Sequence, residues 1–522
     1  LPITNYQLPI MIQRRELLLG GAALVVGTIA PQCQVKTAIA QPKFSQYPFK
    51  LGVASGEPLP DGVVIWTRLA PAPLEGGGMP PEPVAVQWQV AADENMRQIV
   101  RQGEAIATPE LAHSVHVEVE GLQPGRWYWY RFRAGDAESQ IGRTRTAPAL
   151  NETLGQLTFA FASCQDWQNG YYTAHQNLAK EDLELVVFLG DYIYDGGSRS
   201  DTVRSHRTSA AFSLADYRNR YALYKTDPNL QAAHAAFPWI VTWDDHEVQN
   251  DYAGDRSAFG DSPAQFLRRR AAAYQAYYEH MPLRRDRAPQ GSNLRLYRRF
   301  AFGDLAQFNV LDTRQYRTGQ PCGGGFKSRC QQAFDPKATM MGQRQEQWLF
   351  RGLAHSQARW NIIAQQTVLA QFDVDPRSKS ELFDLDQWDG YVAARQRLLK
   401  FLAQRQPANP VVITGDVHSS WVHDLKLDFN NPNSPTVGTE FVGTSLSSNF
   451  PKKFIPTATI AMSRNPHTKF FNATYRGYVR CHLTRDRMVT NYRIVSTIRE
   501  PEASVRTLAS FIVENGQPGA RG

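Results

Sequence analysis

The stretch "VVFLGDYIYDGG", residues 186–197, is an apolar strand that ends abruptly in polar residues. Val, Phe and Leu fill its first half, which is typical of a strand buried on both faces of a sheet. A break at Gly190 follows, and directly after it come Asp191, Tyr194 and Asp195. Carboxylates and a phenol just past the end of a buried strand lie where such sheets bind ligands.

A second stretch, "VVITGDVHSSW" at residues 411–421, repeats this design. An apolar strand again ends at a glycine, and Asp416 and His418 follow it. Because the ends of such strands gather at one edge of a sheet, we expect both strand ends to face a common site.

Three further apolar strands end in the same way. They lead into Cys164 and Asp166, into "TWDDHEVQND" at residues 242–251, and into "LDTRQYR" at residues 311–317. One such group could be turn chemistry, since Asp commonly follows a strand. Five strand ends that carry carboxylate, thiol or imidazole groups are better explained by bound cations, which would offset the charge of the buried carboxylates.

The composition is that of a globular protein with more than one domain. The chain has 522 residues, of which 42% are hydrophobic, and a formal net charge of +8. This length exceeds what one ordinary core accommodates, and the hydrophobic content excludes a disordered chain. No block of like charge stands out, so we expect mild attraction for anions and no requirement for a nucleic-acid partner.

Residues 41–150 show the pattern of a small β-sandwich. Apolar and polar residues alternate in short runs that are separated by turns, which is typical of half-buried strands. The run "HSVHVEVEGLQPGRWYWYRFRAG" at residues 113–135 shows this alternation, and its segment "GLQPGRWYWYRFRA" resembles a fibronectin type III strand pair, with Leu122 and Tyr128 as core residues. Residues 142–156 are interpreted as the linker to the second domain.

Residues 151–522 alternate apolar strands with long helical stretches. We expect strands within 157–163, 183–191, 237–245, 306–314, 360–366 and 410–416, and helices within 213–226, 262–281, 342–357 and 392–406. Nearly continuous apolar strands with intervening helices predict a sheet that is covered on both faces.

Residues 1–40 have the features of an export signal. Arg14 and Arg15 precede an apolar, Gly- and Ala-rich segment, and Ala38 and Ala40 form a small-x-small cleavage pattern. The paired arginines predict a twin-arginine signal; the alternative is a chance Arg-Arg beside an ordinary secretory signal. We expect export through the twin-arginine translocase to the periplasm or the extracellular space, without a transmembrane anchor in the mature form.

The cysteines fit an exported protein. Cys322 and Cys330 flank the Gly-rich loop "CGGGFKSRC" and could close it as a disulfide in an oxidising compartment. Cys481 lies in the alternating run "GYVRCHLT", which predicts a buried, inert thiol on a strand.

The motif order "GDxxY … DDHE … GDVHSS", preceded by "SC" and the paired arginines, resembles the alkaline phosphatase D family, a divergent branch of the calcineurin-like metallophosphoesterases. The resemblance extends over nearly the whole chain. It implies an α/β fold, with an αββα metallophosphoesterase sandwich preceded by a small fibronectin- or immunoglobulin-like β-sandwich. It also implies an exported alkaline phosphatase that acts on small phosphorylated substrates with iron and calcium as cofactors.

The motifs depart from the general metallophosphoesterase pattern in a consistent chemical direction. Cys164 stands in for the first Asp of that pattern, Tyr194 for a later Asp, Asp245 for an Asn and Asp416 for a His. Imidazoles, which suit zinc, are thus largely replaced by other donors. Thiolate and phenolate stabilise a trivalent ion such as Fe³⁺, whereas carboxylates and amides suit Ca²⁺. A phenolate bound to Fe³⁺ would colour the protein.

The metal ligands implied in this way are Cys164, Asp191, Tyr194, Asp245, Asn250, Asp416 and His418. We assign Cys164, Tyr194 and Asp416 to iron together with Asp191, which is expected to bridge, and Asp245, Asn250 and His418 to calcium. The expected catalytic residues are His246, Asp191 and Asp416. His246 would orient the phosphate or protonate the leaving group.

Alternatives remain at this stage. His246 could instead be a core histidine held by Glu247, and Asp195 and Asp312 are placed outside the ligand set. The same site could serve a phosphodiesterase or phospholipase that attacks phospholipid or cell-wall polymer diesters. A non-enzymatic alternative is a surface-polymer binding protein with an inactive phosphatase domain. The preference for monoesters or diesters depends on how open the cleft is, and the segment 200–235 could cover it.

Overall fold

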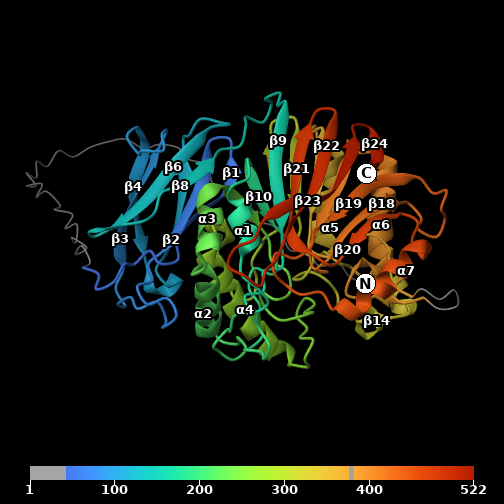
Figure 1. Cartoon of the computed structure of the whole chain (residues 1–522), viewed down its shortest axis with the longest axis horizontal. Coiled ribbons are helices and arrows are strands. Elements are labelled where there is room, and N and C mark those ends of the chain that lie inside the picture. The colour runs from blue at the N-terminus through green and yellow to red at the C-terminus, as the bar shows by residue number, and fades with distance from the viewer. Residues whose placement is uncertain (1–42, 376–380) are drawn as a thin grey trace, which may run out of the picture. The chain divides into compact units, whose positions relative to one another are not determined.

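The computed structural model describes residues 43–375 and 381–522, and the predicted export signal lies outside them. Within these residues, no helix is both long enough and apolar enough to cross a membrane. Two large sheets carry most of the strands (Figure 1).

The larger sheet contains the strand that leads into Asp191. Its ten strands lie in the order β24-β23-β22-β21-β9-β10-β11-β1-β2-β5. Their bounds are β24 (Gln517–Arg521), β23 (Val505–Glu514), β22 (Arg487–Val495), β21 (Arg476–Thr484), β9 (Gln156–Ala162), β10 (Leu185–Phe188), β11 (Pro238–Val241), β1 (Val53–Leu59), β2 (Gly62–Arg68) and β5 (Ser114–Glu120). Because β9, β10 and β11 are parallel neighbours, their carboxyl ends lie at one edge.

The second sheet contains the strand that leads into Asp416. Its seven strands lie in the order β12-β13-β15-β17-β19-β18-β20. Their bounds are β12 (Arg298–Phe302), β13 (Ala306–Val310), β15 (Trp360–Ala364), β17 (Pro410–Thr414), β19 (Thr436–Val442), β18 (Ser420–Lys426) and β20 (Thr468–Asn472). The strands β13, β15, β17 and β19 are parallel, so their carboxyl ends also share an edge.

The two sheets pack face to face because their strands are apolar on both sides. In β10, Leu185 and Val187 belong to the core between the sheets, while Val186 and Phe188 belong to the core under the helices. In β17, Ile413 faces the core between the sheets. The helices are α1 (Thr173–Leu178), α2 (Leu214–Lys225), α3 (Pro228–Ala236), α4 (Pro263–His280), α5 (Gly342–Ala354), α6 (Val392–Arg405) and α7 (Ile455–Ala461).

Helices α1 to α4 contribute to the core on the outer face of the larger sheet, and α5 and α6 to the core on the outer face of the second. This arrangement confirms the predicted αββα layers, and the predicted strands and long helices are confirmed with it. The longest predicted helix, α4, begins at a capping box in which Ser262 and Gln265 satisfy each other's backbone N–H groups.

The N-terminal β-sandwich is also confirmed. A sheet of β3 (Val84–Ala91), β4 (Ile99–Ala107), β6 (Trp127–Ala134), β7 (Ala137–Glu138) and β8 (Gly142–Arg145) faces β1, β2 and β5. The core between them contains Leu122 and Tyr128, as the fibronectin-like pattern predicts. However, β1 pairs in parallel with β11, so the sandwich shares a sheet with the rest of the molecule. The division at residue 150 stays a prediction.

The predicted linker is partly wrong. Its first residues form β8, which pairs with β6, so only the remainder connects the two regions. Thr144 is buried whereas the flanking arginines are half-buried, which is the alternation of a strand. A Cβ at Gly142 would lie 2.3 Å from the ring of Tyr130, so the close approach of β8 to β6 requires glycine there.

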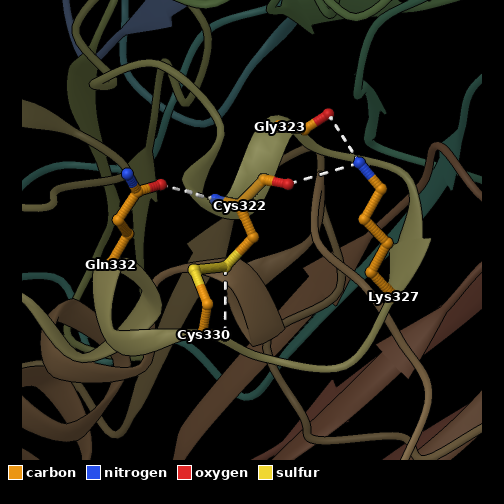
Figure 2. The surroundings of a disulfide bond; sticks show 5 residues. All are labelled: Cys322, Gly323, Lys327, Cys330 and Gln332. Carbon is orange, nitrogen blue, oxygen red and sulfur yellow. Dashed lines mark hydrogen bonds between the residues drawn. A yellow bond between two sulfur atoms is a disulfide. The ribbon is translucent and has the colours of Figure 1, made fainter.

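The Gly-rich loop is closed by a disulfide between Cys322 and Cys330, as the spacing suggests (Figure 2). Lys327 donates from Nζ to the carbonyl groups of Cys322 and Gly323, at 3.2 and 3.4 Å. Within the loop, β14 (Phe326–Lys327) pairs with β16 (Phe383–Asp384), which leads toward the carboxyl ends of the second sheet.

Candidate metal centre

Two glycines allow the strand ends to approach each other. Gly190 has a φ of 113°, and a Cβ there would lie 2.5 Å from the Cβ of Asp244. A Cβ at Gly415 would lie 2.5 Å from Oγ of Ser163. Only glycine therefore permits β10 to end against β11, and β17 to end against β9 of the other sheet. This is the physical reason for a glycine before each of the two aspartates.

The backbone is left-handed at four predicted ligands. The φ angles are 59° at Cys164, 55° at Asp191, 68° at Asp416 and 52° at His418. Non-glycine residues rarely adopt this conformation, which costs of order 1–3 kcal/mol per residue and persists where the surrounding structure enforces it. Four of the fourteen left-handed non-glycine residues in the described chain are thus predicted ligands, which supports a functional role for these strand ends.

The ligand atoms of the strand ends form one continuous cluster. Three groups bring these atoms within 4.8 Å of one another: Cys164 with Asp191 and His418, Asp191 with Asp245 and His246, and Asp244 with Asp245 and Asp416. Asp191 belongs to the first two groups and Asp245 to the last two. The three groups are therefore joined through Asp191 and Asp245, and together they offer enough ligand atoms for more than one cation.

The first group is the thiol and phenol end of the cluster. Tyr194 donates from its hydroxyl to Oδ2 of Asp191 at 2.8 Å, and the hydroxyl oxygen of Tyr194 lies 3.0 Å from Nε2 of His418. Burial and the charge of Asp191 raise the pKa of Cys164 and of Tyr194 well above their usual values. A bound cation would be needed to hold these groups as thiolate and phenolate.

The third group surrounds one guanidinium. Arg314 is fully buried; its Nε donates to Asp244, and its Nη1 donates to Asp386 at 2.7 Å. Its Nη2 lies 3.4 Å from an oxygen of Asp416 and 3.6 Å from one of Asp245. Although burial raises the pKa of Asp245, Arg314 and His246 outweigh that effect and hold it below its usual value. Burial raises the pKa of Asp244 well above its usual value despite Arg314.

The donor set fits bound cations. Four carboxylates contact the guanidinium of Arg314, and among the described residues only Asp386 has a second guanidinium, that of Arg317 at 2.6 Å. Oδ2 of Asp244 and Oδ1 of Asp245 are buried and have no hydrogen-bond partner among the described residues. A buried carboxylate oxygen without a hydrogen bond is costly, and a hard cation is the ligand that would satisfy it.

His246 is held by Asp195, so the alternative in which Glu247 holds it is wrong. Nδ1 of His246 lies 2.8 Å from Oδ1 of Asp195, whose other oxygen accepts from Arg269 at 2.8 Å. Burial lowers the pKa of His246, but the carboxylates of Asp191, Asp245 and Asp195 outweigh burial and hold it well above its usual value.

Glu247 positions the backbone instead. Its carboxylate accepts from the N–H groups of Asp191 at 3.1 Å, Tyr192 at 2.5 Å and Asp244 at 2.8 Å. These groups belong to the turns after β10 and β11, so one side chain fixes both strand ends. Preorganised ligands of this kind depend on such supporting contacts.

The structure brings together seven of the predicted site residues: Cys164, Asp191, Tyr194, Asp245, His246, Asp416 and His418. Asn250 is half-buried and makes no hydrogen bond to them in the described part of the chain. The grouping differs from the predicted division, because His418 lies with Cys164 and Asp416 lies with Asp245. Side chains two residues apart would share a side in an extended strand, but the left-handed backbone at both positions separates them.

Several contributors were not predicted. Asp386 follows β16 with no long apolar run before it, and Ser448 lies in a loop; neither carries a motif. Ser448 Oγ lies 2.7 Å from the hydroxyl of Tyr194. Asp166, which stands where the general pattern has a His, pairs with Arg199 rather than with the cluster. Arg314 lies in the predicted strand end "LDTRQYR", but no sequence pattern shows that it contacts four carboxylates.

Side chains of the segment 200–235 contact the backbone of the turn that carries Tyr194. Nη1 of Arg220, in α2, donates to the carbonyl groups of Tyr194 and Gly196. The hydroxyl of Tyr224, in the same helix, accepts from the backbone N–H of Tyr194 at 3.2 Å. These contacts fix the turn that carries Tyr194.

An αββα core with a buried carboxylate cluster at its strand ends is suited to a hydrolase in which bound cations would neutralise developing charge. The profile of the PhoD-like phosphatase family matches residues 159–492, and the profile of the PhoD-like phosphatase N-terminal domain matches residues 34–148. The chain belongs to the PhoD-like phosphatase family, as the motifs predict.

Two relatives agree with this assignment. Alkaline phosphatase D from Bacillus subtilis (strain 168) is 50% identical over 519 residues, which cover 97% of this chain and 88% of the relative. The solved structure described as "Structure of PhoD" superposes with a TM-score of 0.88 at 50% identity, covering 92% of this chain and 93% of that one. The chain is accordingly a phosphoric-ester hydrolase, and the non-enzymatic alternative is not retained.

Proposed function

We propose that the protein is an exported alkaline phosphatase that hydrolyses phosphate monoesters at a site holding Fe³⁺ and Ca²⁺. The observation that supports this proposal most strongly is the buried cluster, in which carboxylates outnumber the protein's own cations. The Bacillus subtilis relative, which is named alkaline phosphatase D, supports the activity.

The two ends of the cluster suit different ions. Cys164 and Tyr194 would hold Fe³⁺ together with Asp191, because thiolate and phenolate stabilise a trivalent ion. Asp245 and Asp416 would hold Ca²⁺, which prefers carboxylate oxygens. Asp244 would offer a further carboxylate to Ca²⁺, and His418 would offer a nitrogen to Fe³⁺. Asn250 stays a predicted calcium ligand.

Bound cations would neutralise the charge that develops on the phosphoryl oxygens and lower the pKa of the attacking water. His246 would donate a proton to the leaving oxygen. Cations on Asp191 and Asp245 would compensate those carboxylates, so the contact with Asp195 would be the one that keeps the proton on the ring. Arg269 holds Asp195 in place.

The substrate class can be tested with purified, metal-loaded protein. We expect faster hydrolysis of an aryl monophosphate than of the matching bis-aryl phosphate. A faster rate on the diester would favour the phosphodiesterase or phospholipase alternative. In either case His246→Gln should slow hydrolysis less for substrates with better leaving groups, since these need less protonation.

Export is proposed from residues outside the described part of the chain. Arg14 and Arg15 would direct the folded protein to the twin-arginine translocase. Replacing both with Lys should retain the protein in the cytoplasm, as judged by cell fractionation. Normal secretion of this double variant would show that the segment is an ordinary secretory signal.

A further inference from the structure

Two segments that are far apart in sequence bring exposed phenylalanines together. Phe326 lies in β14 and is 56% exposed; Phe454 ends the single helical turn η6 (Lys452–Phe454) and is 45% exposed. Their ring centroids are 6.3 Å apart at an interplanar angle of 23°. Single exposed apolar side chains are ordinary, but neighbouring aromatic rings from two separate loops form an apolar patch that is available for contact.

Three lysines are sequence neighbours of these rings. Lys452 and Lys453 precede Phe454, and Nζ of Lys453 lies 5.1 Å from the centre of its ring. Lys327 follows Phe326 and contacts backbone carbonyl groups of the disulfide loop (Figure 2). Among the described residues none of the three lysines forms an ion pair with an acidic side chain, and Nζ of Lys327 is held by two carbonyl groups, so the charges of Lys452 and Lys453 are the ones most available to a partner.

Both segments adjoin the metal centre. On one side, the N–H of Leu385 donates to the carbonyl of Gly325 at 3.1 Å, and the next residue, Asp386, contacts Arg314. On the other side, Nδ1 of His418 lies 3.0 Å from the carbonyl oxygen of Asn449, shortly before η6. The disulfide holds the loop that carries Phe326. The patch is therefore built on elements that also position the cluster.

We propose that Phe326, Lys327, Lys452, Lys453 and Phe454, together called the aromatic–lysine surface, dock the protein on an anionic lipid bilayer. Aromatic rings enter the boundary between headgroups and acyl chains, and lysines are attracted to anionic headgroups. A soluble anionic polymer would satisfy the lysines but leave both rings in water, so the bilayer fits the chemistry better. This docking goes beyond the proposed function, because it does not depend on which ester is hydrolysed.

Sedimentation of the full chain with lipid vesicles tests the proposal. We expect binding to vesicles of equal parts phosphatidylcholine and phosphatidylglycerol, and little binding to vesicles of phosphatidylcholine alone. Lys452→Gln and Lys453→Gln should each weaken binding roughly fivefold, the loss expected for one lysine at an anionic surface. Phe326→Ser with Phe454→Ser should weaken it by roughly tenfold or more, because two rings no longer leave water.

The matched controls are Phe259→Ser, at a phenylalanine that is 69% exposed elsewhere, and Lys400→Gln on α6. Both should bind like the unaltered protein, and all variants should hydrolyse a small aryl phosphate normally because none alters the cluster. Absence of binding to the anionic vesicles would overturn the proposal. Unchanged vesicle binding by the phenylalanine variant would also overturn it. So would competition in which soluble polyphosphate displaces the protein from the vesicles.

Discussion

The two ends of the candidate metal centre differ in how their buried negative charge is compensated. At the end that contains Asp244 and Asp416, the guanidinium of Arg314 compensates part of the charge. At the end that contains Cys164 and Tyr194, no Arg or Lys side chain of the described residues donates to the thiol, the phenol or Asp191. The carboxylate end is thus preorganised by Arg314, whereas the thiol and phenol end needs a cation before its groups can ionise.

Asp191 joins the two ends, so its loss should have the largest effect. Asp191→Asn should lower kcat by roughly a thousandfold or more, the upper range for removing one electrostatic stabiliser, because both proposed cations would lose a ligand. Metal analysis of the purified variant should show reduced amounts of both ions. The matched control is Glu440→Gln, which alters a buried carboxylate outside the cluster. If Asp191→Asn kept its full metal content, the two ends would not share this residue.

A substitution at Tyr194 tests the thiol and phenol end separately from the carboxylate end. Tyr194→Phe removes one hydroxyl, so the fold should be nearly unchanged, while the visible absorption of a phenolate on Fe³⁺ should disappear. We expect turnover to fall by roughly a hundredfold or more. Tyr192→Phe is the matched control, since that hydroxyl contacts His234 rather than the cluster. A Tyr194 variant that kept both colour and activity would make Tyr194 a packing residue.

The sequence predicts this end of the site better than the other. Gly190 with Asp191 and Tyr194 lies in one short motif, so local pattern and chemistry agree. The αββα layers also follow from local pattern, because strands that are apolar on both faces must be covered on both. The contacts of Arg314 with Asp386 join segments that are 72 residues apart and leave no local trace. The pairing of β1 with β11 is likewise non-local. Asp416 and His418 fall in different groups of the cluster because the backbone is left-handed at both, and no residue preference reveals this conformation.

A substitution at Arg314 tests the carboxylate end separately from the thiol and phenol end. Arg314→Lys keeps the charge but loses the planar fork that contacts several carboxylates at once. Since residues that orient metal ligands typically contribute tenfold to a hundredfold in affinity, roughly tenfold more Ca²⁺ should be needed for half-maximal activity. Calcium titration of chelated protein would measure this. The visible absorption should be unaffected, and a loss of colour instead would contradict the separation of the two ends.

The smallest effect concerns stability. In metal-free protein, burial raises the pKa of Asp191 and Asp244 well above the unfolded value of 3.8. The folded state then keeps protons that the unfolded chain releases, so the free energy of unfolding should fall as the pH rises above about 4 toward neutrality. Denaturant unfolding of chelated protein at several pH values would measure this slope. Asp191→Asn should flatten it, and a slope of opposite sign would contradict the assignment of these carboxylates.

The most direct test of two distinct metal positions is selective removal of calcium from protein isolated without chelator, followed by metal analysis, the visible spectrum and hydrolysis. The carboxylate end should release calcium to a calcium-selective chelator, and hydrolysis should stop. Iron and the visible absorption should remain, and added Ca²⁺ should restore activity. Zinc in place of iron, or activity that returns only with Zn²⁺, would contradict the account.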